Sequence, residues 1–376
     1  MLDLLSPLSL AILFVLCLSA FIQVVYYAFI FSKLAFYKSK EGQQENELPP
    51  VSVIIAARNE YANLEKNLKL ILEQDYPNFE VIVVNDCSWD DSQKLLEYFQ
   101  EGYPNLRICQ LIEQEKYPTG KKFALTMGIK AAQYNQLFFT DADCEPASKN
   151  WLRLMQSRFT DKHEIVLGFS PSKKHPGLLN LFIRFESVFT AMAYFSAAIG
   201  KNAFMGVGRS LAYTRDLFFK NKGFAKHQHI LSGDDDLFIN QVATSSNVTI
   251  QLNPESFVYT EPKKSFDAWQ RQKSRHVSTG KYYKPKHQIF LGTYYASLFL
   301  FYASLIAFPM LDPNWIIPVS IYGFRLLLEL FMMYFILKKF RSIQMIWFIP
   351  LLDFIYLFYI TIFGIKGLFI KNNKFW

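Results

Sequence analysis

Two acidic stretches of this sequence have the residue types and spacing for chemistry. The first, "FFTDADCEP", places Asp141 and Asp143 two residues apart, directly after an apolar run. In a turn this spacing brings both carboxylates towards one cation, and Mg²⁺ or Mn²⁺ binds through one or two carboxylates plus substrate phosphates. The alternative is a polar turn in which either residue caps the helix that follows.

The second stretch, "GDDD", sets Asp234, Asp235 and Asp236 in a row. Adjacent carboxylates repel one another unless a cation, a helix end or a reaction uses them. The following "DLFINQVA" predicts a helix start, and the helix dipole favours acidic residues in the first turn, most simply Asp236. Repulsion among the three would raise the pKa of any one of them that acts as a base.

Four short apolar runs predict the strands that position these residues. They are residues 51–56, 81–85, 106–112 and 136–140, separated by helical patterns. Strands and helices alternating in this way form βαβ units, so we expect an α/β fold with a mostly parallel sheet and helices on both faces. Ligands of such sheets bind outside the carboxyl ends of the strands. The residues directly after the strands are therefore expected on one edge: Ala57 to Glu60, Asp86, Asp141 and Asp143.

The apolar residues, 51% of the 376-residue chain, concentrate at its two ends. About 20 helical residues cross a bilayer, and four uncharged or nearly uncharged runs are that long: 8–31, 289–311, 314–337 and 344–365. We therefore expect a transmembrane helix within 1–34, a globular domain at 50–285 and a C-terminal membrane region of about three helices at 288–367.

Charged residues indicate how the chain meets the membrane. Lys33, Lys38 and Lys40 follow the first apolar run, and the positive-inside rule then predicts a cytoplasmic globular domain. The net charge of +8 comes without a basic block, so it indicates anionic lipid and not nucleic acid. In the last two apolar runs Arg325 and Glu329 lie four apart and can neutralise one another, whereas the sequence identifies no partner for Asp353.

Six motifs in a fixed order resemble those of the family-2 glycosyltransferases. They are "IIAARNE", "VVNDCS", "GKKFAL", "TDADCEP", "GDDD" and "QKSRH". The resemblance covers residues 50–285 and implies the Rossmann-like GT-A fold that binds nucleotide sugars. The flanking membrane segments are similar to those of ceramide glucosyltransferases and bacterial polysaccharide synthases, which implies a multi-pass protein of a bacterial inner membrane.

The resemblance implies roles for residues on the donor side. The first-strand loop would hold the nucleotide base and ribose, Asp86 would read the uracil or ribose, and Lys121, with Lys122 as the alternative, would lie near the diphosphate. Asp141 would face the ribose and donor sugar, and Asp143 would hold the metal. The loop residues concerned are Ala56, Arg58 and Glu60.

On the acceptor side, the resemblance makes Asp235 the general base, with Asp234 as the runner-up. "QRQKSRH" is close to the family's Q-x-x-R-W, so Gln272 and Arg275 would grip the diphosphate. His276 replaces the family tryptophan, which argues against a processive polymer synthase. The alternative for this segment is a basic amphipathic helix on the membrane surface, and we expect interfacial helices at 177–200 and 265–282.

"FMGVGRSLAYTR" resembles the family's glycine-containing acceptor loop. Gly206 and Gly208 would allow close backbone approach, and Arg209 or Arg215 would contact the substrate. Together the motifs predict an inverting, Mg²⁺- or Mn²⁺-dependent transfer of a sugar from a nucleotide donor, a UDP-sugar, to a lipid-linked or saccharide acceptor.

Two rival functions fit the sequence less well. A nucleotidyltransferase would favour a glycine-rich phosphate loop after the first strand, and "AARNE" has no glycine. A non-catalytic membrane scaffold would not need the carboxylates of the motifs, all of which are present.

Overall fold

The structure is a computed structural model that describes residues 6–39, 48–113, 120–230 and 232–369, with side chains to residue 366. The chain divides into two compact units. The helical unit comprises the described residues within Met1–Lys38, Val188–Ser196 and Arg271–Ile370. The sheet unit comprises those within Ser39–Ser187 and Ala197–Gln270.

The sheet unit is built on a seven-stranded sheet in the order β3-β2-β1-β4-β7-β6-β8. The first four strands are parallel, β7 is antiparallel to both of its neighbours, and β6 and β8 are parallel. The strands are β1 (Val51–Ala57), β2 (Phe79–Asp86), β3 (Leu106–Leu111), β4 (Gln136–Phe139), β6 (Ile165–Leu167), β7 (Leu211–Thr214) and β8 (Val248–Ile250). The expected mostly parallel α/β sheet is confirmed.

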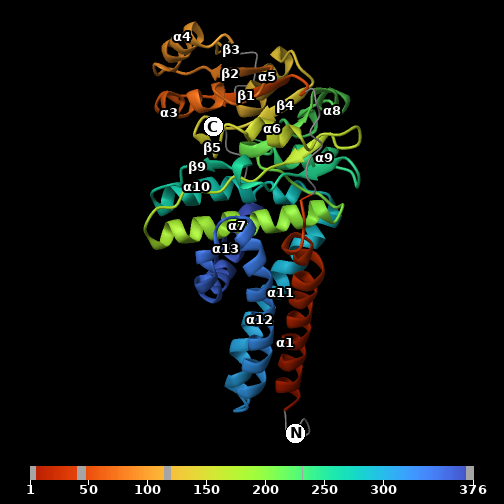
Figure 1. Ribbon diagram of the computed structural model, residues 1–376. Helices are drawn as coiled ribbons and strands as arrows, with labels where there is room; N and C mark the ends of the chain where they lie inside the picture. Colours follow the sequence, from red (N-terminus) through yellow and green to blue (C-terminus); the bar gives the residue numbers. More distant parts are fainter. Residues whose placement is uncertain (1–5, 40–47, 114–119, 231, 370–376) are drawn as a thin grey trace. The chain divides into compact units, whose positions relative to one another are not determined.

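Helices cover both faces of this sheet because its strands are apolar on both sides. On one face Val51, Val53 and Ile55 pack with side chains of three helices, α3 (Tyr61–Leu72), α4 (Ser92–Gly102) and α6 (Trp151–Gln156). On the other face lies α5 (Lys121–Ala131) (Figure 1). A Cβ at Gly128 would come within 2.7 Å of Ile54, so glycine lets α5 approach the sheet closely.

Smaller elements complete the sheet unit. A two-stranded antiparallel sheet pairs β5 (Cys144–Pro146) with β9 (Val258–Thr260), directly after the Asp141–Asp143 turn. The remaining helices that lie in or enter this unit are α7 (Leu178–Ile199), α8 (Arg215–Lys220), α9 (Asp236–Val242) and α10 (Phe266–Val277), with short 3₁₀ turns such as η3 (Gly208–Ser210).

The helical unit contains α1 (Pro7–Val25), α11 (Pro285–Leu311), α12 (Ile316–Lys339) and α13 (Ile349–Phe369). Figure 1 shows α1, α11 and α12 side by side. A π-helical segment (Tyr26–Phe31) and α2 (Ser32–Ala35) continue α1. Among the described residues five helices are long and apolar enough to cross a membrane: Pro7–Ala35, Leu178–Ile199, Pro285–Leu311, Ile316–Lys339 and Ile343–Lys366.

The helical unit buries a cluster of charged side chains, here called the helical-unit cluster. Arg325 Nη1 lies 2.7 Å from Glu329 Oε2 and 2.7 Å from Asp353 Oδ2. The Tyr27 hydroxyl donates to Glu329 Oε1 at 2.8 Å, and the Tyr302 hydroxyl donates to Asp353 Oδ2 at 2.7 Å. Asp353 therefore has partners that the sequence did not identify. These contacts join the π-helical segment Tyr26–Phe31, α11, α12 and α13.

Candidate active site

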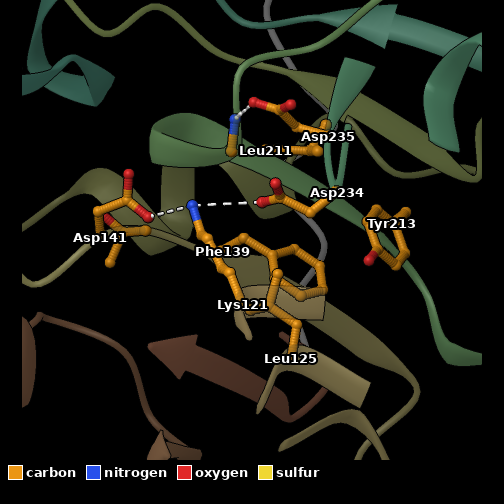
Figure 2. A pocket seen from close by; sticks show the side chains of 10 residues that line it. Lys121, Leu125, Phe139, Asp141, Leu211, Tyr213, Asp234 and Asp235 are labelled. Atoms are coloured by element: carbon orange, nitrogen blue, oxygen red, sulfur yellow. Dashed lines mark hydrogen bonds and ion pairs between the residues drawn. The ribbon is translucent and has the colours of Figure 1, made fainter. Parts of the chain in front are cut away.

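Lys121 is the central cation of the site (Figure 2). Its Nζ donates to Asp141 Oδ1 at 2.8 Å and lies 3.2 Å from Asp234 Oδ2. Burial opposes its charged form, but Asp141, Asp234 and Asp235 outweigh burial and raise the pKa of Lys121. Lys121 opens α5 after Gly120, whose φ of +139° favours glycine. One amine thus connects the two acidic stretches.

Asp235 lies beside this ion pair and accepts two backbone hydrogen bonds. Its Oδ2 accepts from the Gly208 N–H at 2.7 Å, and its Oδ1 accepts from the Asp236 N–H at 2.7 Å. Asp235 is therefore the N-cap of α9, and Asp236 is the first helical residue. Burial, followed by the charges of Asp234 and Asp236, raises the pKa of Asp235 to about 7, although Lys121 and the Gly208 N–H oppose the shift.

These residues line one pocket, whose empty volume is about 270 Å³ including the space open to solvent. Its polar wall brings together residues from four parts of the chain, namely Lys121, Thr140, Asp141, Gly208, Asp234 and Asp235. Its apolar floor consists of Leu125, Phe139, Leu211 and Tyr213. The rings of Phe139 and Tyr213 stack at 4.4 Å. The pocket therefore has a charged wall and an apolar floor.

The Asp141–Asp143 turn fits a hard divalent cation. A carboxylate oxygen from each residue and the Cys144 sulfur lie within 4.8 Å of one another. The Cys144 thiol lies 3.3 Å from Asp143 Oδ1, to which it donates, and burial raises the pKa of Cys144 well above its ordinary value. The protonated thiol is therefore a hydrogen-bond donor, and the two carboxylates supply the oxygen ligands that Mg²⁺ and Mn²⁺ prefer.

Glu60 lies close to the same turn. Burial raises the pKa of its carboxyl group, and the charges of Asp143 and Asp141 raise it further. Asn63 donates to Glu60 Oε2 at 2.5 Å, which holds the side chain at the start of α3. The predicted first-strand loop therefore places one acidic residue beside the candidate cation site.

Asp86 ends β2 with a completely buried carboxylate. Neither of its oxygens has a hydrogen-bond partner of normal geometry among the described residues. Burial raises the pKa of Asp86, and the charge of Arg58 opposes that shift. Ala56 lies in β1 opposite Val84 of the same strand pair. A buried carboxylate with unused acceptors is suited to a ligand that donates hydrogen bonds.

The two glycines of the predicted acceptor loop differ. A Cβ at Gly206 would lie 3.0–3.3 Å from Leu211, Leu167 and Ile239, so Gly206 packs against the core. Gly208 instead faces Asp235, where a Cβ would have ordinary contact at 3.4 Å. Only Gly208 lines the pocket.

The other predicted residues lie away from the pocket lining. Lys122 donates to the carbonyl oxygens of His227 at 2.7 Å and Ile230 at 2.9 Å, and burial lowers its pKa to about 8. Arg215 donates to the Ile129 carbonyl. Gln272, Arg275 and His276 lie on the second half of α10, in the helical unit, so their roles stay predictions.

Two features of the site were not predicted from the sequence. The Gly208 N–H bond to Asp235 depends on strand order, and no local pattern signals it. Tyr213, whose ring forms part of the floor, is an ordinary strand residue in the sequence, and only its position opposite Leu137 on β4 and beside Phe139 reveals its place.

Comparisons with known proteins show the family and the fold of the chain. The sequence profile of glycosyl transferase family 21 matches residues 13–365. The chain is 31% identical over 194 residues to glycosyltransferase AglE of Haloferax volcanii, which covers 50% of this chain and 59% of that protein. It is 29% identical over 126 residues to the beta-monoglucosyldiacylglycerol synthase of a Nostoc species, covering 32% of this chain and 26% of that protein. The matches therefore span less than two thirds of these relatives' lengths.

A solved structure shares the fold across almost the whole chain. It is the mannosyltransferase PcManGT from Pyrobaculum calidifontis, in complex with GDP-Man and Mn²⁺. The match covers 96% of this chain and 98% of that protein, with a TM-score of 0.62 and 19% sequence identity.

Proposed function

The chain belongs to glycosyl transferase family 21, and from that premise we propose that it is an inverting, metal-dependent glycosyltransferase. It moves a sugar from a nucleotide donor, a UDP-sugar, to a lipid or saccharide acceptor at the cytoplasmic face of a membrane. The observation that carries the proposal is the placement of Lys121 between Asp141 and Asp234, beside the half-buried Asp235.

The donor side follows from the residues around Asp141. Asp141 and Asp143 would hold Mg²⁺ or Mn²⁺, which when bound neutralises the charge that develops on a diphosphate leaving group. Lys121 orients the diphosphate, and Asp86 accepts hydrogen bonds from the nucleoside. Arg58 and Glu60 flank that nucleoside.

The acceptor side follows from Asp235. Its carboxylate takes the proton of the acceptor hydroxyl while that oxygen forms a bond to the anomeric carbon of the sugar. The bond between the anomeric carbon and the diphosphate oxygen breaks, and the leaving group keeps the electron pair. One displacement inverts the anomeric configuration. A pKa of about 7 suits this role, because a base near the working pH is both ionised and basic enough to accept the proton.

The membrane helices support a lipid or lipid-linked acceptor. Five helices have the length and composition to cross a membrane, and one relative is named as a synthase of a glycolipid. His276 in place of the family tryptophan supports a single transfer over a processive one.

The direct test is transfer by the full-length protein in lipid nanodiscs. We expect one labelled UDP-sugar from a panel of UDP- and GDP-sugars to label a lipid-extractable or saccharide product when Mn²⁺ or Mg²⁺ is present. Chelation of the metal should abolish labelling, and product length measures processivity. Release of pyrophosphate in place of a nucleoside diphosphate would identify a nucleotidyltransferase and overturn the proposal.

Asp143→Ala tests the metal assignment separately. Loss of a carboxylate ligand should weaken Mn²⁺-dependent UDP affinity at least about tenfold, since hydrogen bonds and contacts to charged groups contribute about 1.5–3 kcal/mol. Asp161→Ala removes an exposed carboxylate of the same unit and should leave that affinity unchanged. Equal Mn²⁺-dependent affinities for the two variants would contradict the assignment.

A further inference from the structure

Arg209 is the one residue of the predicted acceptor loop whose charge faces both acidic stretches. It lies in η3, between Gly208 and the start of β7. Burial opposes the charged form of Arg209, but four acidic groups around its guanidinium outweigh burial and raise its pKa. In order of effect these groups are Cys144, Asp141, Asp143 and Asp235.

Among the described residues, the Arg209 guanidinium donates a hydrogen bond through Nε and not through its two terminal nitrogens. Nε donates to Ser170 Oγ at 2.9 Å, and Ser170 is buried. Within the described part of the chain, its two terminal nitrogens donate no hydrogen bond and make no ion pair. An arginine has five N–H groups, so four remain for a ligand while the Ser170 contact fixes the plane of the fork.

Arg107 and Arg153 of the sheet unit use their terminal nitrogens on protein acceptors, whereas Arg215 donates through Nε to the Ile129 carbonyl at 3.3 Å. Arg107 Nη1 donates to Glu80 Oε2 at 2.7 Å and to the Ala131 carbonyl at 2.9 Å. Arg153 Nη2 donates to the Asp75 carbonyl and pairs with its carboxylate at 3.6 Å. Arg209 differs because its terminal nitrogens are left unused beside carboxylates.

The charge balance of the site indicates which ligand the terminal nitrogens of Arg209 would bind. Asp141, Asp143, Asp234 and Asp235 are opposed by Lys121 and Arg209. A divalent cation on the Asp141–Asp143 turn would bring the formal charge to zero. An anion entering such a site needs a further donor that is not already paired, and a planar guanidinium fork matches two oxygens of a phosphate group.

Resting on the proposed function, we infer that Arg209 binds the donor phosphate group that carries the sugar, and not the acceptor. This phosphate is the β-phosphate of a nucleoside diphosphate sugar. It must lie between the cation at Asp141–Asp143 and the base Asp235, because the anomeric carbon attached to it meets the acceptor oxygen there. Gly208, the residue before Arg209, lines the pocket and donates its N–H to Asp235 Oδ2 at 2.7 Å, and the charges of Asp141, Asp143 and Asp235 act on the guanidinium.

Binding of products and fragments tests the inference without turnover. The affinities of UDP, UMP, GDP and GMP are measured with Mn²⁺ on the purified full-length protein and on Arg209→Met, Arg209→Lys and Arg153→Met. We expect Arg209→Met to weaken diphosphate binding at least about tenfold, because a charged hydrogen bond is lost. Monophosphate affinity should change by less than about threefold, since the lost contact is to the β-phosphate.

Arg209→Lys keeps the charge but loses the two-pronged fork, so its diphosphate affinity should fall between those of the parent protein and Arg209→Met. Arg153→Met controls for the loss of an arginine, and it should bind as the parent does. Thermal unfolding of each variant shows whether it is folded, and Arg209→Lys keeps the test decisive if Arg209→Met is not.

The outcomes separate the inference from the function on which it rests. If UDP and UMP lose affinity equally in Arg209→Met, or neither does, Arg209 does not bind the β-phosphate. A raised acceptor KM with unchanged diphosphate affinity would place Arg209 on the acceptor and also overturn the inference. If the parent protein binds neither UDP nor GDP with Mn²⁺, the proposed function itself fails.

Discussion

Two groups of charged side chains in this molecule share their chemistry but differ in how they are enclosed. In the helical-unit cluster Arg325, Glu329 and Asp353 are each 1% exposed or less. In the active site the Lys121 and Asp141 side chains are 22% and 30% exposed. The carboxylates of the first cluster contact its own tyrosines and arginine, whereas the second cluster opens on a pocket. Enclosure, and not residue type, separates a structural ion cluster from one that is built for a ligand.

Neither cluster is electrically balanced by its own members. In the helical unit one guanidinium meets two carboxylates, and Asp353 Oδ1 and Arg325 Nε have no partner among the described residues. Removing one partner of a buried ion pair is costly, because the remaining charge is left uncompensated in apolar surroundings. In the active site, under the proposed function, a divalent cation would offset the excess of carboxylates. Substitutions should therefore affect stability in the first cluster and chemistry in the second.

Asp235→Asn should give the largest effect and the clearest contrast. Loss of the base should lower kcat/KM for transfer by ~10²–10⁴, while Mn²⁺-dependent UDP affinity stays intact. Thermal stability should change little, because removal of a charge beside Asp234 and Asp236 is offset by the loss of one of the two backbone hydrogen bonds that Asp235 accepts. Asp216→Asn, at an exposed helix start in the same unit, is the control. Normal turnover by Asp235→Asn would transfer the role of base to Asp234.

Arg325→Met should show the opposite pattern. It leaves two buried carboxylates without their cation, which costs about 3–5 kcal/mol of unfolding free energy. Thermal and denaturant unfolding in detergent measures the loss, and UDP affinity of the folded fraction should be unchanged. The control is Arg341→Met, at an exposed position of the same unit. Combining Arg325→Met with Glu329→Gln and Asp353→Asn should recover much of the stability, and a failure to recover would show that the cost was not electrostatic.

Tyr302→Phe should have a smaller effect of the same kind. It removes one hydrogen bond to a buried carboxylate, at 2.7 Å, which contributes about 1.5–3 kcal/mol. Tyr134→Phe is the matched control, because its hydroxyl bonds Asn78 Oδ1 at an exposed site, where the loss should be below ~0.5 kcal/mol. Equal losses of stability in the two variants would show that burial adds nothing to the hydrogen bond between Tyr302 and Asp353.

The smallest expected effect is the pH dependence of stability and turnover that comes from Asp235 in the active site. The pKa of Asp235 in the folded protein, about 7, lies above its ordinary 3.8. Between these values the folded protein holds a proton that the unfolded chain has lost, so this group lowers stability as pH rises from about 4 to 7. Asp235→Asn should lose that part of the slope in unfolding measurements. In the parent enzyme kcat/KM should rise with pH through an apparent pKa near 7. An apparent pKa near 4 in this profile would contradict the assignment of Asp235 as the base.

The strand ends could be predicted from the sequence because the apolar runs that mark strands are local signals. Asp86 and Asp141 follow apolar runs that form strands, and a parallel sheet brings such positions to one edge. Asp236 was expected at a helix start, and it is the first residue of α9. The pairing of Lys121 with both Asp141 and Asp234 joins residues far apart in sequence, and the sequence did not predict it.

The helical-unit cluster shows what sequence reasoning could not find. Arg325 and Glu329 lie one helical turn apart, so their pairing follows from spacing alone. Asp353 lies on another helix, and which helix faces meet depends on packing along the whole unit. The same limit hid the Gly208 bond to Asp235, because it requires knowing that β7 inserts antiparallel beside β4.

The reversed direction of β7 has a consequence for how proteins of this architecture diversify. The chain leaves β4 before it reaches Asp141, but it reaches Gly208 and Arg209 before it enters β7. The Asp141–Asp143 turn is therefore anchored by a strand upstream of it, and Gly208 and Arg209 are anchored by a strand downstream of them. Insertions ahead of Gly206 can lengthen the connection without changing the register of β7. Under the proposed function, this connection can vary with the acceptor while Asp141, Asp143 and Arg209 keep their anchors.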